Sequence, residues 1–73
     1  MKLYPFDDAL TGAMEMMERG ATFYQQFNCS FCGAKQTMGV PNKFFIEGIC
    51  EECGNITDIK KDGCNYTVHF TIG

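Results

Sequence analysis

The sequence predicts a small α+β domain stapled by a metal ion, with an N-terminal helix packed on an antiparallel sheet of short strands. Three observations predict this fold. The five-residue pattern CSFCG at 29–33 returns as CEECG at 50–54. An apolar helical period runs through residues 7–19. Strand-like segments rich in aromatic residues and Thr then follow as far as the C-terminus.

The chain is short, with 73 residues, so we expect one domain over 1–73. Apolar residues make up 45% of it, which is not the composition of a disordered chain. A domain of this size is marginal on hydrophobic burial alone, and an added staple is expected. The five cysteines are the obvious source of that staple.

The helix is expected over 7–19, with Asp7 as its N-cap and Gly20 as its stop signal. Its apolar face would carry four side chains: Leu10, Ala13, Met14 and Met17. Because an isolated helix of this length is unstable, it needs a surface to pack against.

The remaining residues, 22–72, predict four to five short antiparallel strands, joined by turns at 39–43 and 61–65. The clearest alternation closes the chain, where Tyr66, Val68, Phe70 and Ile72 share one face. The expected core of the whole domain is Leu10, Met14, Met17, Phe23, Phe27, Ile46, Ile49, Val68 and Phe70.

The cysteine spacing is C-x2-C-x17-C-x2-C, which is typical of a four-cysteine zinc site. The predicted ligands of one structural Zn²⁺ are Cys29, Cys32, Cys50 and Cys53. Each pair sits on a tight turn, here called a knuckle, and Gly33 or Gly54 lets the chain turn beneath the metal. Four thiolates leave no open coordination position, so the site predicts a structural role.

Two other uses of the cysteine pairs stay open at this point. An iron site takes the same four ligands, and the sequence separates iron from zinc poorly. A redox carrier would use a cycling Cys pair, which normally lies at a helix N-terminus in a βαβ unit. Both pairs here join strand-like segments instead.

Two CxxCG knuckles on β-hairpins resemble the zinc-ribbon superfamily, and the resemblance covers roughly residues 22–72. It implies an antiparallel zinc ribbon as the fold and zinc as the metal, but it implies no single function. More loosely, four segments are similar to small uncharacterised phage-encoded zinc-ribbon proteins: QQFNCSFCGAKQTM, PNKFF, GICEECGNITDI and GCNY. That likeness implies a phage or prophage origin and no activity.

The charge balance disfavours a nucleic-acid binder. Nine acidic and six basic residues give a formal net charge of −3, and four thiolates on one Zn²⁺ would make it more negative. The N-terminal MKLYPFDDAL lacks the apolar run of a signal peptide, and no stretch reaches the length of a membrane span. We therefore expect a cytoplasmic chain (in the host cell if it is phage-encoded) that contacts no membrane.

The first functional hypothesis is a protein-interaction module, such as an adaptor or an inhibitor of a host nucleic-acid-handling protein. Glu51 and Glu52 make an acidic tip that could meet a basic partner surface. Met38 and Val40, in the turn, would add exposed apolar contacts near a polar rim.

The alternative hypothesis is a nucleic-acid-binding ribbon. It requires the basic residues of the ribbon to lie on one side: Lys35, Lys43, Lys60 and Lys61. An exposed aromatic ring, that of Tyr24, Phe44 or Phe45, would then stack on bases. No set of residues suggests catalysis, so we expect neither an enzyme nor a small-molecule substrate. Cys64 is expected in the core and His69 on the solvent face of the last strand.

Overall fold

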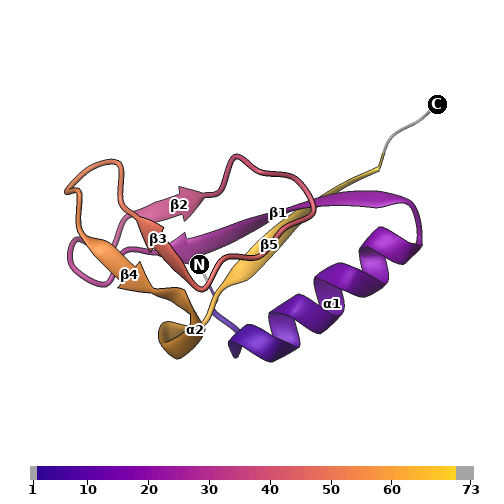
Figure 1. Ribbon diagram of the computed structural model, residues 1–73, viewed down its shortest axis with the longest axis horizontal. Coiled ribbons are helices and arrows are strands. Elements are labelled where there is room, and N and C mark those ends of the chain that lie inside the picture. Colours follow the sequence, from indigo (N-terminus) through magenta and orange to yellow (C-terminus); the bar gives the residue numbers. More distant parts are fainter. Residues whose placement is uncertain (1, 71–73) are drawn as a thin grey trace.

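The computed structural model describes residues 2–70, which form two helices and five strands (Figure 1). Helix α1 (Phe6–Glu18) comes first, followed by β1 (Ala21–Asn28), β2 (Lys35–Thr37), β3 (Glu47–Ile49) and β4 (Ile56–Asp58). A one-turn helix α2 (Ile59–Asp62) then leads into β5 (Asn65–Phe70). The predicted α+β class, with an N-terminal helix and short antiparallel strands, is confirmed.

The strands form two separate antiparallel sheets. One has the order β2-β1-β5, with the long strand β1 in its centre, and the other consists of β3 and β4. The β1–β5 ladder runs from the Ala21–Phe70 pair to the Gln26–Asn65 pair. Figure 1 shows α1 running alongside β1 and β5, with the β3–β4 sheet at the opposite end of the molecule.

Helix α1 begins and ends one residue before the predicted bounds of 7–19. Pro5 occupies the N-cap position, so Asp7 lies in the first turn and the expectation that it caps the helix is wrong. Pro5 is compatible with this position because the first helical amides have no intrahelical acceptor to lose. Gly20 has φ +90° and its N–H donates to Met17 O, as expected of a helix stop.

The buried face of α1 is made of small residues, not of the predicted long ones. Ala9 and Ala13 are buried, whereas Met14 is 41% exposed. Gly12 shows why: a Cβ added there would lie 2.6 Å from the Tyr66 hydroxyl of β5. The helix packs so close to the sheet that only small side chains fit between them, and Met14 turns outward.

Within the predicted core, Phe23 and Phe27 are buried, and Leu10, Met17 and Val68 are half-buried. The prediction is wrong for three further residues, which are largely exposed: Ile46, Ile49 and Phe70. Phe70 lies opposite Ala21, at the end of the β1–β5 ladder. The last part of the predicted alternation, including Ile72, lies outside the described residues.

Ile49 is exposed because its neighbour Gly48 takes the inward position. A Cβ on Gly48 would lie 2.6 Å from Phe27 Cζ, so the β3–β4 sheet packs directly on the Phe27 ring through this glycine. Thr57, opposite Gly48, is also buried. Alternation then sends Ile49 and its partner Ile56 outward, where they are 66% and 56% exposed.

Candidate metal centre and the adjoining groove

The first knuckle joins β1 to β2 through a tight turn. The N–H of Cys29 donates to Ala34 O at 2.9 Å, and the N–H of Gly33 donates to Cys29 O at 3.0 Å. Gly33 has φ +75°, in the left-handed region that a side chain makes costly. Cys29 and Cys32 thereby point to the same side of the turn.

The second knuckle repeats this geometry between β3 and β4. The N–H of Cys50 donates to Asn55 O at 3.0 Å, the N–H of Gly54 donates to Cys50 O at 2.9 Å, and Gly54 also has φ +75°. The duplicated sequence pattern is thus a duplicated backbone structure. The two turns lie next to each other at one end of the molecule (Figure 1).

The four sulfur atoms of Cys29, Cys32, Cys50 and Cys53 all lie within 4.8 Å of one another. The Sγ atoms of Cys29 and Cys53 are 3.5 Å apart, and those of Cys32 and Cys50 are 3.6 Å apart. A tetrahedral ion with bonds of about 2.3 Å to sulfur requires sulfur–sulfur separations of about 3.8 Å. The cluster therefore has the donor set and the dimensions to hold one metal ion.

Hydrogen-bond donors surround the sulfur atoms. The backbone N–H groups of Phe31 and Cys32 approach Cys29 Sγ at 3.4 and 3.5 Å. Around the second knuckle the donors are side-chain amides: Gln36 Nε2 lies 3.6 Å from Cys50 Sγ, and Asn55 Nδ2 lies 3.3 Å from Cys53 Sγ. Such donors stabilise thiolate and orient it for a metal.

The thiols of the first knuckle are shifted in opposite directions. The N–H groups of Cys32 and Phe31 lower the pKa of Cys29 to about 6. The Ala34 N–H lowers the pKa of Cys32, but the neighbouring thiols of Cys29 and Cys50 outweigh it and raise that pKa to about 12. Sulfur atoms this close cannot all carry charge without a cation between them.

The cluster lies at the surface with one side covered. Cys29 and Cys50 are buried, whereas Cys32 and Cys53, the second cysteine of each knuckle, are exposed. Thr57 of β4 holds the first knuckle in place, since its Oγ1 accepts from the N–H of Ser30 at 3.0 Å. Gln36 of β2 supports the second knuckle in turn, since its Oε1 accepts from the N–H of Glu51 at 3.4 Å.

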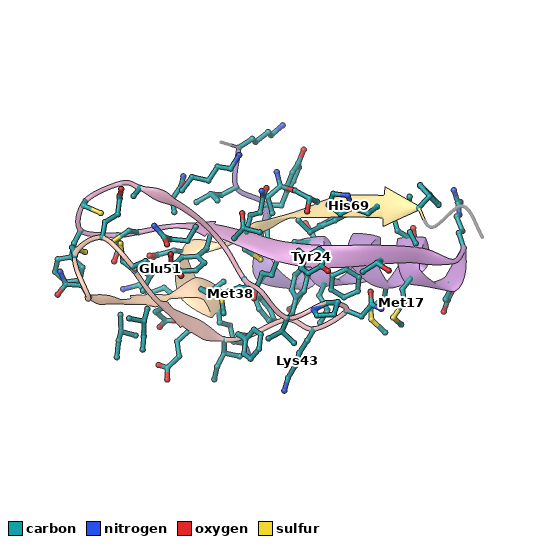
Figure 2. All side chains as sticks on the ribbon, turned by 90° about the horizontal axis from the view of Figure 1, so that it is seen from above. Met17, Tyr24, Met38, Lys43, Glu51 and His69 are labelled. Carbon is teal, nitrogen blue, oxygen red and sulfur yellow. The ribbon has the colours of Figure 1, made fainter. Side chains whose placement is uncertain are left out.

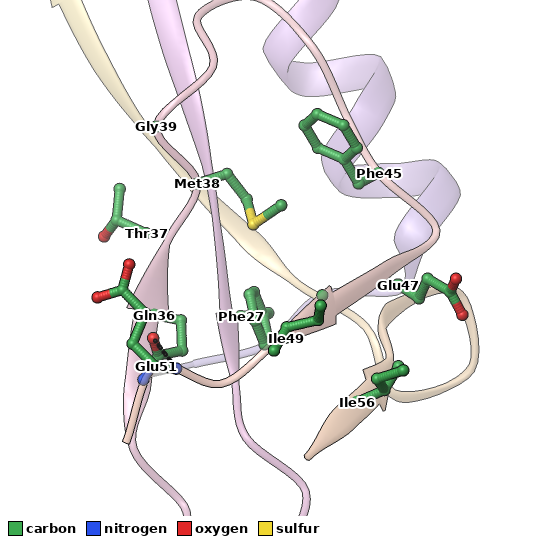
Figure 3. Close-up of a pocket in the computed structure, with 11 residues that line it drawn as sticks. Phe27, Gln36, Thr37, Met38, Gly39, Phe45, Glu47, Ile49, Glu51 and Ile56 are labelled. Atoms are coloured by element: carbon green, nitrogen blue, oxygen red, sulfur yellow. Dashed lines mark hydrogen bonds between the residues drawn. The ribbon is translucent and has the colours of Figure 1, made fainter. Parts of the chain in front are cut away.

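A groove of about 500 Å³ adjoins the metal-binding end, between β2 and β3 (Figure 3). Its apolar lining comes from Phe27, Met38, Phe45, Ile49 and Ile56. Glu47 and Glu51 line it as well, and both are exposed. We call this the β2–β3 groove. It combines an apolar lining with an acidic border.

Buried Gln25 holds the loop that forms one wall of this groove. Its Nε2 donates to Phe45 O at 3.0 Å and its Oε1 accepts from Phe45 N–H at 2.8 Å. Its own carbonyl accepts from Met38 N–H at 2.8 Å. Asn42, at φ +57°, adds a reciprocal pair of bonds to the backbone of Phe23. The loop is therefore fastened to β1 along its length.

Only some of the predicted partner-binding residues lie in the groove. The structure places Met38, Phe45 and Glu51 in the groove, whereas Glu52 lies exposed on the second knuckle and Val40, 44% exposed, is not part of the lining. Figure 2 shows Glu51 and Met38 toward the knuckle end of the molecule, with His69 and Met17 toward the other end.

The basic residues needed for a nucleic-acid surface come from different elements. Lys35 lies on β2, and Lys43 lies in the loop with its Nζ 5.1 Å from the centre of the Phe45 ring. Lys60 and Lys61 lie on α2. The neighbouring aromatic residue, Phe44, packs edge-on against Phe6 and Phe23 and is half-buried.

Sequence reasoning missed four residues of this region: Gln36, Glu47, Ile49 and Ile56 as surface residues of the groove. Ile49 is one of the predicted core residues, and the structure instead exposes it at the groove. Gly48 is the signal that could have corrected this assignment, since a glycine inside a strand often marks close packing.

Cys64 and His69 lie where they were expected. Cys64 is fully buried beside Gln25, whose Nε2 is 3.7 Å from its sulfur. Burial raises the pKa of this thiol, although the Gln25 amide opposes the shift. His69 is exposed, and its ring meets Tyr24 edge-on at 5.8 Å.

Neither helix within residues 2–70 has the length and apolar character needed to cross a bilayer. Comparisons of the chain with protein-family models, with curated proteins and with solved structures give no significant match. The described residues form a cluster of four cysteines that could hold one metal ion, consistent with a zinc-ribbon-like site, and this cluster lies beside an apolar groove.

Proposed function

We propose that this chain is a protein-interaction module, built around a structural Zn²⁺ ion, that binds its partner through the β2–β3 groove. The observation that carries the proposal is the exposed apolar lining next to the metal cluster. Ile49 and Ile56 face each other on the outer side of the β3–β4 sheet, mostly exposed, and continue into the groove lined by Met38 and Phe45. Contiguous exposed apolar residues with a polar border are typical of a binding surface.

Zinc is the metal that this donor set suits best, because four thiolates in a tetrahedral shell are the usual structural zinc site. In this proposal the ion is a staple, bound by Cys29, Cys32, Cys50 and Cys53. It holds β3 and β4 against β1 and β2, and so gives the groove its shape. The chain then acts by recognition and not by catalysis.

An acidic groove fits the hypothesis of an adaptor or inhibitor directed at a basic nucleic-acid-handling protein. Glu47 and Glu51 border the groove, and Glu52 and Asp58 lie exposed on adjacent turns and strands. Such a surface attracts basic partner surfaces and speeds their association at low salt.

Affinity capture with matched variants tests this proposal. The zinc-loaded protein is immobilised and exposed to lysate with and without nuclease treatment, beside the double variant Ile49→Thr/Ile56→Thr. The control Phe70→Thr removes an equally exposed apolar side chain from the far end of β5. Both variants introduce only Thr, a residue that favours strands.

The proposal predicts a protein retained by the parent chain and by the Phe70 variant, and lost from the groove variant. The purified partner should then bind the parent chain and the Phe70 variant with similar affinity. Equal retention by all three would place the interaction elsewhere and overturn the proposal. Retention that disappears on nuclease treatment would assign the chain to nucleic-acid binding instead.

A further inference from the structure

Strand β3 has a free edge beside the β2–β3 groove. It pairs with β4 on one side, and within residues 2–70 no strand pairs with its other side. The Cys50 N–H donates to Asn55 O, so Cys50 directs its backbone groups toward β4. Ile46, four residues earlier, does the same, since its carbonyl accepts from Lys60 N–H at 3.1 Å. Hydrogen-bonded pairs alternate in an antiparallel ladder, so Gly48 bonds β4. The N–H and C=O groups of Glu47 and Ile49 therefore point away from β4.

The side chains along this edge alternate in the same way. At Gly48 the strand rests on the Phe27 ring, whereas Ile49 projects outward. A further strand laid along this edge would send one set of side chains inward, toward Phe27 and Met38. It would send the other set outward, next to Ile49. Both sets would meet apolar surface in the middle of such a strand.

The ends of this edge are acidic. Glu47 lies directly opposite Asp58 in the β3–β4 ladder, and both are exposed. Like charges in directly opposed positions are unfavourable. Asp58 has a structural use, because its Oδ1 accepts from Lys61 N–H and caps α2. Glu47 and, two residues beyond the strand, Glu51 line the groove and are available to a basic partner.

From this arrangement we infer that the partner presents an extended segment that adds to β3 as a strand, with three consecutive apolar residues between two basic ones. The basic side chains lie beside Glu47 and Glu51. The outer two apolar side chains enter the groove, and the central one packs next to Ile49. Backbone bonds to Glu47 and Ile49 supply affinity, and the alternate side chains supply specificity. The inference rests on the proposed use of the β2–β3 groove.

A synthetic peptide tests this inference directly. The probe is the acetylated and amidated peptide Ser-Thr-Lys-Val-Val-Val-Lys-Thr-Ser, whose central five residues read the same in both directions. It is titrated into the zinc-loaded, 15N-labelled full chain and followed by NMR. The expected result is saturable binding, with shifts at groove residues and at least tenfold slower hydrogen exchange of the Glu47 and Ile49 amides.

Backbone methylation distinguishes strand addition from other modes of binding. One probe carries N-methyl on the central Val, and a second carries it on the preceding Val. Because alternate residues of a strand face its neighbour, one of the two should bind about tenfold more weakly and the other almost normally. Equal effects at both positions, or protection of amides outside β3, would overturn the inference.

Charge is tested by replacing both Lys residues of the peptide with Glu, and by the protein variant Glu47→Lys/Glu51→Lys. Each should lose at least tenfold in affinity, and the control Glu15→Lys/Glu18→Lys on exposed positions of α1 should not. Absence of binding by the parent peptide overturns this inference alone if groove-dependent capture of a protein persists. Loss of groove-dependent capture overturns the proposed function as well.

Discussion

The side-chain amide of Gln36 joins the metal cluster to the groove: its Nε2 lies 3.6 Å from Cys50 Sγ, while its Oε1 accepts from Glu51 N–H at 3.4 Å. Gln36 stands opposite Phe27 in the β1–β2 ladder and lines the β2–β3 groove. One side chain thus contacts a metal-binding sulfur, the backbone of the second knuckle and the groove. Metal binding at the cluster and the shape of the β2–β3 groove are therefore expected to depend on each other.

Replacing Gln36 should weaken metal binding without unfolding the chain. In Gln36→Leu the donor to Cys50 is lost, and loss of such an outer-shell partner typically costs 10- to 100-fold in metal affinity. Lys35→Leu, an exposed change on the same strand, is the control. Competition with a chromophoric chelator measures both variants. Equal zinc affinities would show that the amide does not support the sulfur.

Removal of the metal should unfold the protein. A structural zinc site contributes on the order of 10 kcal/mol to folding, which exceeds what so small a core supplies. Metal analysis should give one zinc per chain, and chelation should abolish the far-UV circular dichroism of the folded state. Cys53→Ser should fail to fold with zinc, whereas Cys64→Ala should fold. A chain that unfolds at the same temperature with and without chelator would contradict this prediction.

Gly48→Ala should destabilise the zinc-loaded protein by about 1–3 kcal/mol, the usual range for overpacking a core. The new methyl group would lie 2.6 Å from Phe27 Cζ and 3.1 Å from Ile59 Cδ1, and both of these residues are fully buried. Gly39→Ala is the matched control, since no other atom of residues 2–70 lies within 4 Å of its Cβ position. Urea unfolding at constant zinc concentration compares the two; similar midpoints would refute the close packing.

Gln25→Leu should cost about 1–3 kcal/mol, because it leaves the N–H and C=O of Phe45 without their partners. The loop at 38–46 should loosen, and the groove with it. Hydrogen exchange at the Phe45 amide reports this locally and should accelerate. If the exchange rate stays as it is in the parent chain, the loop is held by other contacts.

Cys64 should resist thiol reagents in the folded, zinc-loaded protein and react fully after denaturation. It is 0% exposed, and burial raises its pKa above the ordinary 9.0. Because the thiol is buried and protonated, a disulfide-exchange assay at pH 8 should count no rapidly reacting thiol. One fast thiol at that pH would place Cys64 at the surface. The raised pKa also has a consequence for stability: it stabilises the folded state at pH values below 9.0, and this contribution is lost as the pH rises through the folded-state pKa.

The cysteine spacing alone determined the metal-binding end of the molecule. Each CxxCG turn supplies two of the four ligands of one tetrahedral ion, so the pattern predicts that the two turns meet. The sulfur atoms of Cys29, Cys32, Cys50 and Cys53 do lie together. The helix, its stop at Gly20 and the presence of short strands also followed from local signals, because caps and turns depend on adjacent residues.

Tertiary packing decided which faces are buried, and there the sequence was ambiguous. Met14 and Ala13 both fit the helical period, but the close approach of Gly12 to Tyr66 leaves room only for the small side chain. Ile49 fits a core strand as well as a surface strand, until Gly48 rests on Phe27 and fixes the phase. A shift of one residue exchanges the two faces of a strand, so the groove exists only because distant residues set that register.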